Sequence, residues 1–137
     1  MIDAGLILEG GGMRGLYTIG VLDLLLDEGL LFSHIYGVSA GACHAMSYIS
    51  GQRGRAMKTV TEYIHDRRYA SVYSLLTTGD FFGGKFNYRD VPERLLPLDF
   101  DAYETRGVSM RVVVTNCRTG EAEYIPLPDA RKGMIYV

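Results

Sequence analysis

Twice in the N-terminal part of this chain, a short apolar segment passes through glycines into a helical pattern. The first apolar segment, residues 5–8, is followed by Glu9 and three consecutive glycines. From residue 13 to 28, apolar side chains recur at spacings of three and four, as they do in a helix with one apolar face. A buried strand that leads through a tight loop into a helix is the unit from which parallel sheets are built.

The same pattern then repeats. Residues 34–38 have the composition of a second short strand, and the small and apolar residues 40–49 favour a buried helix that ends before Gly51. Strand, helix, strand and helix in this order predict a βαβ arrangement with parallel strands. We therefore expect an α/β fold with three layers, α/β/α, around a mainly parallel sheet.

The rest of the chain carries fewer signals. Residues 54–68 are predicted to be helical, and residues 77–87 are predicted to be a loop rich in glycine and phenylalanine. Residues 109–115 contain three consecutive valines and form the strongest strand pattern, with residues 121–125 as the antiparallel partner across a turn. No internal repeat is present, and the length suits one domain.

Composition limits the partners that the chain can have. A net charge of -2 gives no basic excess of the kind that nucleic-acid binding needs, so no nucleic acid is expected. Cys43 and Cys117 form neither a metal-binding pattern nor a disulfide framework, which predicts a reducing cytoplasmic compartment. No segment approaches the ~20 apolar residues of a spanning helix, so membrane contact is expected to be peripheral.

The glycines and serine of the second turn have the spacing of a nucleophile. Gly37, Ser39 and Gly41 form a G-x-S-x-G motif between a predicted strand and a predicted helix. A serine at such a turn is held in strained backbone geometry with its hydroxyl exposed. The flanking glycines let backbones pass where a Cβ would clash, and the following helix directs its N–H groups at the reacting centre. Ser39 is the candidate nucleophile; the alternative is a plain glycine turn that contains a serine.

The first turn, residues 10–15 (GGGMRG), has the composition of an anion-binding loop. Its bare N–H groups can hold the oxyanion of an acyl-transfer reaction, where the loss of one donor typically costs ~3 kcal/mol. Gly10, Gly12 and Gly15 also fit the G-x-G-x-x-G pattern of dinucleotide sites. Such a site uses an acidic residue at the end of the second strand, where this chain has its serine motif instead. A Walker A loop is excluded, because no Gly-Lys-Ser/Thr follows.

Together the two motifs resemble the patatin-like phospholipase family. That family begins with a strand, a G-G-G-x-R/K-G loop, a helix and a strand that ends in G-x-S-x-G. The match is strong over the first half of this chain and continues weakly through residues 112–116 and 119–121. The resemblance implies a lipid acyl hydrolase that acts on a phospholipid or another acyl lipid, with Ser39 as nucleophile and no metal or organic cofactor. It also implies the oxyanion loop, formed by Gly10, Gly11, Gly12, Arg14 and Gly15.

The family's second catalytic group is missing from its expected motif. The resemblance implies a Ser–Asp dyad whose aspartate lies in a D-G-G or D-G-A motif, and this chain contains no Asp-Gly pair. His44 is badly placed along its helix to take the proton of Ser39, and His34 and His65 are expected to be structural or solvated. The sequence therefore predicts that residues 1–137 are the N-terminal part of a single patatin-like domain. The apolar run 134–137 ends it without a terminator, and an exposed sheet edge allows association into oligomers.

Two other functions stay open. One is a catalytically incomplete patatin-like module that binds lipid or a partner protein, and the other is a nucleotide-binding protein that uses residues 10–15. Within the patatin reading, Arg14 is expected to support the oxyanion loop. Phe81, Phe82 and Phe86, beside two glycines, are predicted to form an apolar rim at the entrance for the acyl chain; the alternative is that they fill core under a loop.

Overall fold

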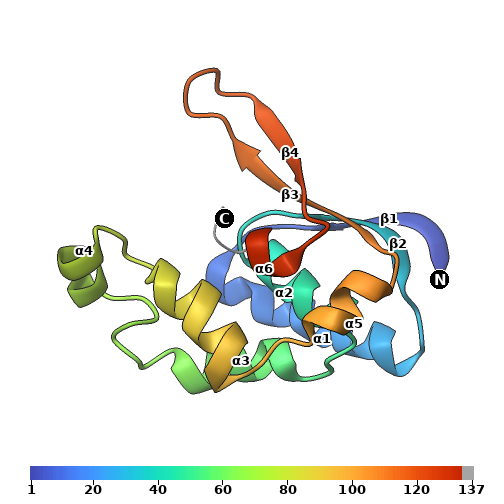
Figure 1. The fold of residues 1–137 in the computed structure, drawn as a ribbon, viewed down its shortest axis with the longest axis horizontal. Helices are drawn as coiled ribbons and strands as arrows, with labels where there is room; N and C mark the ends of the chain where they lie inside the picture. Colours follow the sequence, from blue (N-terminus) through green and yellow to red (C-terminus); the bar gives the residue numbers. More distant parts are fainter. Residues whose placement is uncertain (134–137) are drawn as a thin grey trace.

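A computed structural model describes residues 1–133 of the protein, as one four-stranded sheet with helices packed against it (Figure 1). The strands lie in chain order across the sheet. The first three are parallel, and the last returns antiparallel. They are β1 (Ile2–Leu8), β2 (Phe32–Gly37), β3 (Ser109–Thr115) and β4 (Ala122–Pro126). The apolar run 134–137 lies outside the described residues.

The helices connect these strands. A short 3₁₀ turn, η1 (Gly12–Arg14), and α1 (Gly15–Asp27) join β1 to β2, and α2 (Ala40–Ile49) leaves the end of β2. The long connection from α2 to β3 contains α3 (Arg55–Tyr63), α4 (Val72–Thr78), the π-helix η2 (Phe86–Leu95) and α5 (Phe100–Thr105). The last helix, α6 (Ala130–Gly133), follows β4.

The core lies between the sheet and α2. Ile35 of β2 pairs in register with Met110 of β3, and these two residues and Val112 share a buried cluster with Ala45 and Ile49 of α2. α2 is buried at almost every position, because its small residues let the helix approach the strands closely. Because α2 packs closely against β2 and β3, its first turn is held against the ends of the strands.

The opposite face of the sheet is exposed in the described residues. Ile7 exposes 73% of its surface there, and Tyr36 packs edge-on against Tyr124 with 6.1 Å between ring centres. In Figure 1 the larger helices lie together on one side of the strands. The α/β class with a mainly parallel sheet is confirmed, and the helical layer seen here covers one of its two faces.

Several predicted elements are confirmed. α2 and β3 have the predicted bounds, and β4 pairs antiparallel with β3 across the predicted turn. The helix predicted over residues 54–68 is shorter and ends at Tyr63.

The prediction of a continuous loop over residues 77–87 is wrong in part, because α4 extends to Thr78 and η2 begins at Phe86. The reason lies in local capping. The Ser71 hydroxyl accepts a hydrogen bond from the Ser74 N–H at 2.9 Å, and Gly79 ends the helix with a φ of 87°. These caps define a short helix of seven residues.

Candidate active site

Ser39 lies at the junction of β2 and α2 in a strained backbone conformation. Its φ is 49° and its ψ is -124°, and within residues 1–133 no other non-glycine residue has a positive φ. Such a conformation costs on the order of 1–3 kcal/mol and persists only where neighbouring structure enforces it. Here the Val38 N–H donates to the Leu8 carbonyl at 3.0 Å, and the Gly41 N–H donates to the Val38 carbonyl at 2.9 Å. The end of β1 thus fixes the turn that presents the serine.

The two glycines beside Ser39 are required by close packing. A Cβ at Gly37 would stand 2.5 Å from the Cα of Ala42, and a Cβ at Gly41 would collide with the carbonyl oxygen of Leu8. The predicted steric reason for both glycines is confirmed. β1 therefore passes directly over the start of α2.

The glycine loop after β1 lies against Ser39. Because β1 and β2 are parallel neighbours with Leu8 opposite Gly37, the loops that follow them meet at one edge of the sheet. A Cβ at Gly10 would be 3.1 Å from the Cβ of Ser39. The sheet thus brings together the two predicted motifs.

The remaining loop residues turn into α1. The Arg14 N–H donates to the Gly11 carbonyl at 3.1 Å, and Gly12 has a φ of 53°. The exposed Arg14 side chain runs beside Gly11, with its Nε 3.7 Å from where a Cβ of Gly11 would stand. The guanidinium therefore lies along the loop, which is compatible with the predicted supporting role.

His44 contacts the other end of this loop. It lies on α2, exposes 6% of its surface, and its buried Nε2 has no hydrogen-bond partner within residues 1–133. A Cβ at Gly15 would come within 2.5 Å of that nitrogen. Burial lowers the pKa of His44 to about 4, so the imidazole is neutral at neutral pH. His44 faces Gly15 and also lines the pocket that contains Ser39, so its expected poor placement for taking the proton of Ser39 stays a prediction.

The other two histidines are exposed. His34 lies on β2, with its Nε2 4.0 Å from the carboxylate of Asp3 on β1, and His65 follows α3. Neither belongs to the pocket described next.

A pocket with a volume of about 180 Å³ has Ser39 in its wall. Its lining is mostly apolar and comes from α2, α3, η2 and the segment before η2. Among the lining side chains are Ala42, Cys43, Met46, Val60, Phe82 and Val91. Phe81 and Phe82 are exposed and Phe86 is buried, so the predicted phenylalanine rim is present at Phe82 and absent at Phe86.

Cys43 and Tyr88 both line this pocket and are neighbours within it. Cys43 is open to the pocket space but closely surrounded by protein atoms, and this desolvation raises the pKa of its thiol. Burial, reinforced by the neighbouring Cys43, raises the pKa of the Tyr88 hydroxyl to about 12. Both groups are therefore protonated at neutral pH. The i, i+4 spacing from Ser39 could have placed Cys43 in the pocket, whereas nothing in the sequence indicates Tyr88.

Acidic groups are missing from the described pocket. Among residues 1–133, no aspartate or glutamate lines it, and no group of three potential metal ligands occurs. Within the same residues, no helix has the length and apolar character needed to cross a membrane. The polar groups at the pocket include the Ser39 hydroxyl, the Cys43 thiol, the Tyr88 hydroxyl, the His44 imidazole and the Arg55 guanidinium, in a lining that is otherwise mostly apolar.

These features define a class of protein: an α/β fold that presents a strained serine, with a glycine loop beside it, in the wall of an apolar pocket. A family model described as Patatin-like phospholipase matches residues 6–131, and the chain belongs to the patatin-like phospholipase family. The resemblance drawn from the two glycine motifs is thereby confirmed.

One curated relative shows the same similarity over a shorter stretch. The uncharacterized protein YjjU of Escherichia coli (strain K12) is 38% identical over 65 residues, which are 47% of this chain and 18% of that protein. The match therefore spans less than a fifth of the relative's length. No solved structure matches the chain.

Proposed function

We propose that the protein is a lipid acyl hydrolase in which Ser39 is the nucleophile. The observation that carries the proposal is the strained backbone of Ser39, which has a φ of 49° at the start of α2. Ser39 also lies in the wall of an apolar pocket. A strained serine at a strand-to-helix turn is the arrangement of serine hydrolases. Membership of the patatin-like phospholipase family supports an acyl lipid as substrate.

In this reaction the Ser39 oxygen attacks the acyl carbonyl carbon of the bound ester. The N–H groups of residues 10–15 hold the negative charge that develops on the carbonyl oxygen, because this loop lies against Ser39. The tetrahedral intermediate breaks its bond to the alcohol, which leaves with a proton, and an acyl-enzyme remains. Water then attacks the acyl-enzyme and releases the fatty acid. No metal or organic cofactor takes part in the proposed steps.

The acyl chain lies in the apolar pocket beside α2. Ala42 and Met46 follow Ser39 along α2, and both line the cavity together with Val91 of η2. A methylene chain that enters here leaves water, and each buried CH₂ contributes about 0.8 kcal/mol of binding. The preference for lipid esters follows from this apolar lining.

The base of the reaction is an aspartate in a Ser–Asp dyad, as the family resemblance implies. A serine hydroxyl is a weak nucleophile without such a partner. The histidine on α2 does not fill this role, because the Nε2 of His44 lies against Gly15 and its pKa of about 4 makes it a weak base. The proposal therefore assigns catalysis to the natural full-length protein and expects negligible turnover from residues 1–137 alone.

Labelling with a fluorophosphonate tests the nucleophile. Full-length protein treated with the probe should carry one adduct, which peptide mass spectrometry places on Ser39. Ser39→Ala should abolish both the adduct and the hydrolysis of a nitrophenyl ester. Ser33→Ala is the matched control, because Ser33 is the preceding serine, on β2, and bonds the Asp3 carboxylate at 3.2 Å. An adduct on another serine in the wild-type protein contradicts the proposal.

A second candidate is a patatin-like module that binds lipid without hydrolysing it. The absence of a carboxylate from the pocket lining of residues 1–133 favours it. The two candidates separate in one assay: the module would bind a fluorescent fatty acid in the pocket, yet would show neither labelling of Ser39 nor ester turnover.

We also propose a cytoplasmic location, peripheral membrane contact and association of two copies. Both cysteines are free, which supports a reducing cytoplasmic location, and a lipid substrate supports peripheral contact with a membrane. Within the described residues β1 has one unpaired edge, and association of two copies through it is proposed. Sedimentation of the full-length protein at increasing concentration measures that association.

A further inference from the structure

Helix α4 has its apolar side chains turned outward. Leu76 exposes 81% of its surface, and Val72, Tyr73 and Leu75 are also exposed, whereas Ser74 exposes only 2%. A surface helix normally buries its apolar stripe and exposes its polar residues. α4 reverses this arrangement, so its sequence has not been shaped by packing against the described core.

Two phenylalanines extend the exposed apolar surface. Phe81 and Phe82 follow α4, are exposed, and pack edge-on with 5.4 Å between ring centres. We call the six side chains together the apolar cap. It consists of Val72, Tyr73, Leu75, Leu76, Phe81 and Phe82.

The apolar cap is held on a rigid base. The Ser71 N–H donates to the Phe81 carbonyl at 3.0 Å, and the Gly83 N–H donates to the Tyr69 carbonyl at 3.1 Å. These two bonds close the chain around α4, which in Figure 1 stands at the margin of the molecule, away from the strands. The cap therefore projects from the surface as a fixed feature.

The apolar cap shares one residue with the lining of the pocket. Phe82 belongs to the cap and also lines the pocket that contains Ser39. Tyr69, another lining residue, packs edge-on against Phe82 with 6.4 Å between ring centres. A lipid surface in contact with the cap would thus lie next to the pocket entrance.

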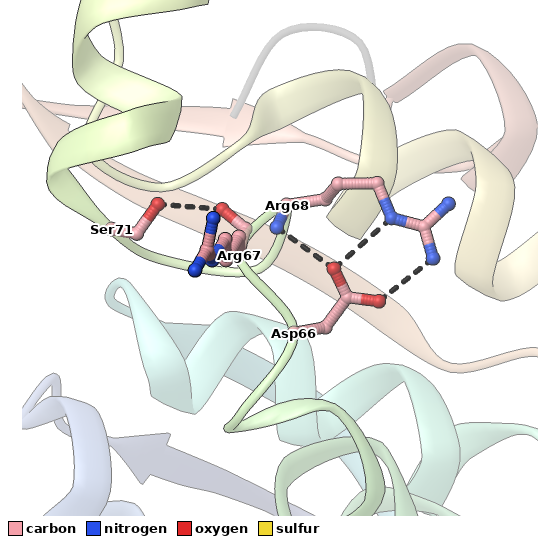
Figure 2. A network of polar contacts seen from close by, with 4 residues as sticks. All are labelled: Asp66, Arg67, Arg68 and Ser71. Carbon is pink, nitrogen blue, oxygen red and sulfur yellow. Dashed lines mark hydrogen bonds and ion pairs between the residues drawn. The ribbon is translucent and has the colours of Figure 1, made fainter.

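Basic side chains flank the base of the cap. Arg68 bonds the Asp66 carboxylate at 2.7 Å, and the Arg67 carbonyl accepts the Ser71 hydroxyl at 2.6 Å (Figure 2). In Figure 2 the Arg67 guanidinium lies outside the Asp66–Arg68 ion pair. Lys85 follows the cap on the other side, and within residues 1–133 neither Arg67 nor Lys85 has a salt bridge.

The cap and its flanks carry a positive balance. From residue 66 to 85 the basic side chains are Arg67, Arg68 and Lys85, and the acidic ones are Asp66 and Asp80, although the whole chain has a net charge of -2. Because Asp66 pairs with Arg68, the excess positive charge of this segment lies on Arg67 and Lys85. Exposed apolar residues bordered by arginine and lysine are the composition of segments that bind the headgroup region of anionic membranes. The positive charge beside the cap favours a lipid surface with anionic headgroups as its partner. An apolar protein surface without acidic residues would leave this charge unmatched.

We propose that the apolar cap docks the protein onto a bilayer that contains anionic phospholipid, with the leucines of α4 in the acyl region and Arg67 and Lys85 at the headgroups. This orientation places the mouth of the pocket at the surface from which an acyl chain is drawn. The role of docking in supplying substrate to the pocket rests on the proposed function. The docking itself is inferred from the exposed apolar cap and its basic flanks.

Vesicle sedimentation of the full-length protein tests the proposal. Vesicles of phosphatidylcholine with phosphatidylglycerol should bind the protein, and pure phosphatidylcholine should bind it more weakly. The double substitution Leu75→Ser/Leu76→Ser should weaken binding to the mixed vesicles by about tenfold or more, since two leucines lose their burial in lipid. Arg67→Gln/Lys85→Gln should remove the preference for phosphatidylglycerol. The matched control is Tyr17→Ser, because Tyr17 on α1 exposes 84% of its surface and lies outside the cap.

Further readouts separate this proposal from the proposed function. Ser39→Ala should bind vesicles as the wild type does while losing hydrolysis, so a failure of catalysis leaves the docking result interpretable. Leu75→Ser/Leu76→Ser should hydrolyse a soluble short-chain ester at the wild-type rate and keep the wild-type melting temperature. Unchanged vesicle binding in that variant overturns the proposal. So does a marked fall in its melting temperature, which would show that protein, not lipid, covers the cap.

Discussion

A β-carbon added to Gly15 would stand 2.5 Å from Nε2 of His44, so the glycine loop and the helix that begins at Ser39 are in direct contact. His44 and Ser39 belong to one rigid helix end, and Gly15 follows the loop that lies against the serine. The contact therefore joins the proposed oxyanion loop to the helix that follows the proposed nucleophile.

We expect Gly15→Ala to destabilise the protein by about 1–3 kcal/mol, because the added methyl overpacks a buried contact that neither helix can relax. Gly20→Ala is the matched control. Gly20 lies on the same helix with open space where its Cβ would stand, so alanine there should be neutral or stabilise by up to about 1 kcal/mol. Urea unfolding of both variants measures the difference. Equal unfolding free energies for Gly15→Ala and Gly20→Ala would show that the loop moves to make room for the added methyl group beside His44.

The buried imidazole of His44 should make the fold sensitive to acid. Its pKa is about 4 in the folded protein and 6.5 when solvated, because burial disfavours the charged form. The stability that this neutral histidine retains is fully present above pH 6.5 and is lost as the pH falls from 6.5 toward 4. The loss should reach on the order of 3 kcal/mol, since each pKa unit corresponds to about 1.4 kcal/mol.

The measurement is the free energy of unfolding at several pH values between 7 and 4, for wild type and His44→Gln. The variant cannot acquire the charge, so its stability should fall less steeply over this window. His34→Gln is the control, because His34 is exposed on β2. Parallel pH profiles for wild type and His44→Gln would contradict the assignment of acid sensitivity to His44.

The strained backbone of Ser39 predicts opposite effects of two small substitutions. Ser39→Gly should be more stable than Ser39→Ala by about 1 kcal/mol, because glycine adopts a positive φ without a steric penalty. Both variants should lose fluorophosphonate labelling, so stability and reactivity separate. Thermal unfolding of the two variants gives the comparison. An alanine variant as stable as the glycine variant would mean that the backbone at residue 39 relaxes.

Arg55 should stabilise the fold, because its planar guanidinium makes three hydrogen bonds at once. Its guanidinium is buried and donates to the Ser47 hydroxyl at 3.0 Å, the Leu96 carbonyl at 2.7 Å and the Pro97 carbonyl at 3.3 Å. Burial lowers its pKa to about 10, which still leaves it charged at neutral pH. Arg55→Lys should cost about 2 kcal/mol, because one ammonium cannot reach three acceptors in the same fork.

Arg53→Lys is the control for Arg55→Lys. Arg53 is exposed and pairs with Asp27 at 2.6 Å, and exposed pairs of this kind contribute less than about 1 kcal/mol. Denaturant unfolding should therefore show a clearly larger effect at Arg55. An equal loss of unfolding free energy in Arg53→Lys and Arg55→Lys would show that the buried hydrogen bonds of Arg55 add no extra stability.

Sequence alone determined the elements whose causes are local. The bounds of α2 and β3 follow from runs of small or β-branched residues, and the turn at Ser39 follows from Gly37 and Gly41 on either side. Such patterns can be read directly, because neighbours along the chain impose them. Adjacency of the glycine loop to Ser39 could also be expected, since the ends of parallel neighbouring strands meet at one edge of a sheet.

Only the tertiary structure decided what surrounds the serine. Tyr69 and Tyr88 reach the pocket from a part of the chain that no periodic pattern ties to α2. The outward face of α4 likewise depends on the two backbone bonds at its base, and its apolar residues, taken by themselves, would have predicted burial. The physical reason is that contacts between distant segments depend on the path of the whole chain and on which surfaces remain after the core has formed, and neither is encoded in the spacing of nearby residues.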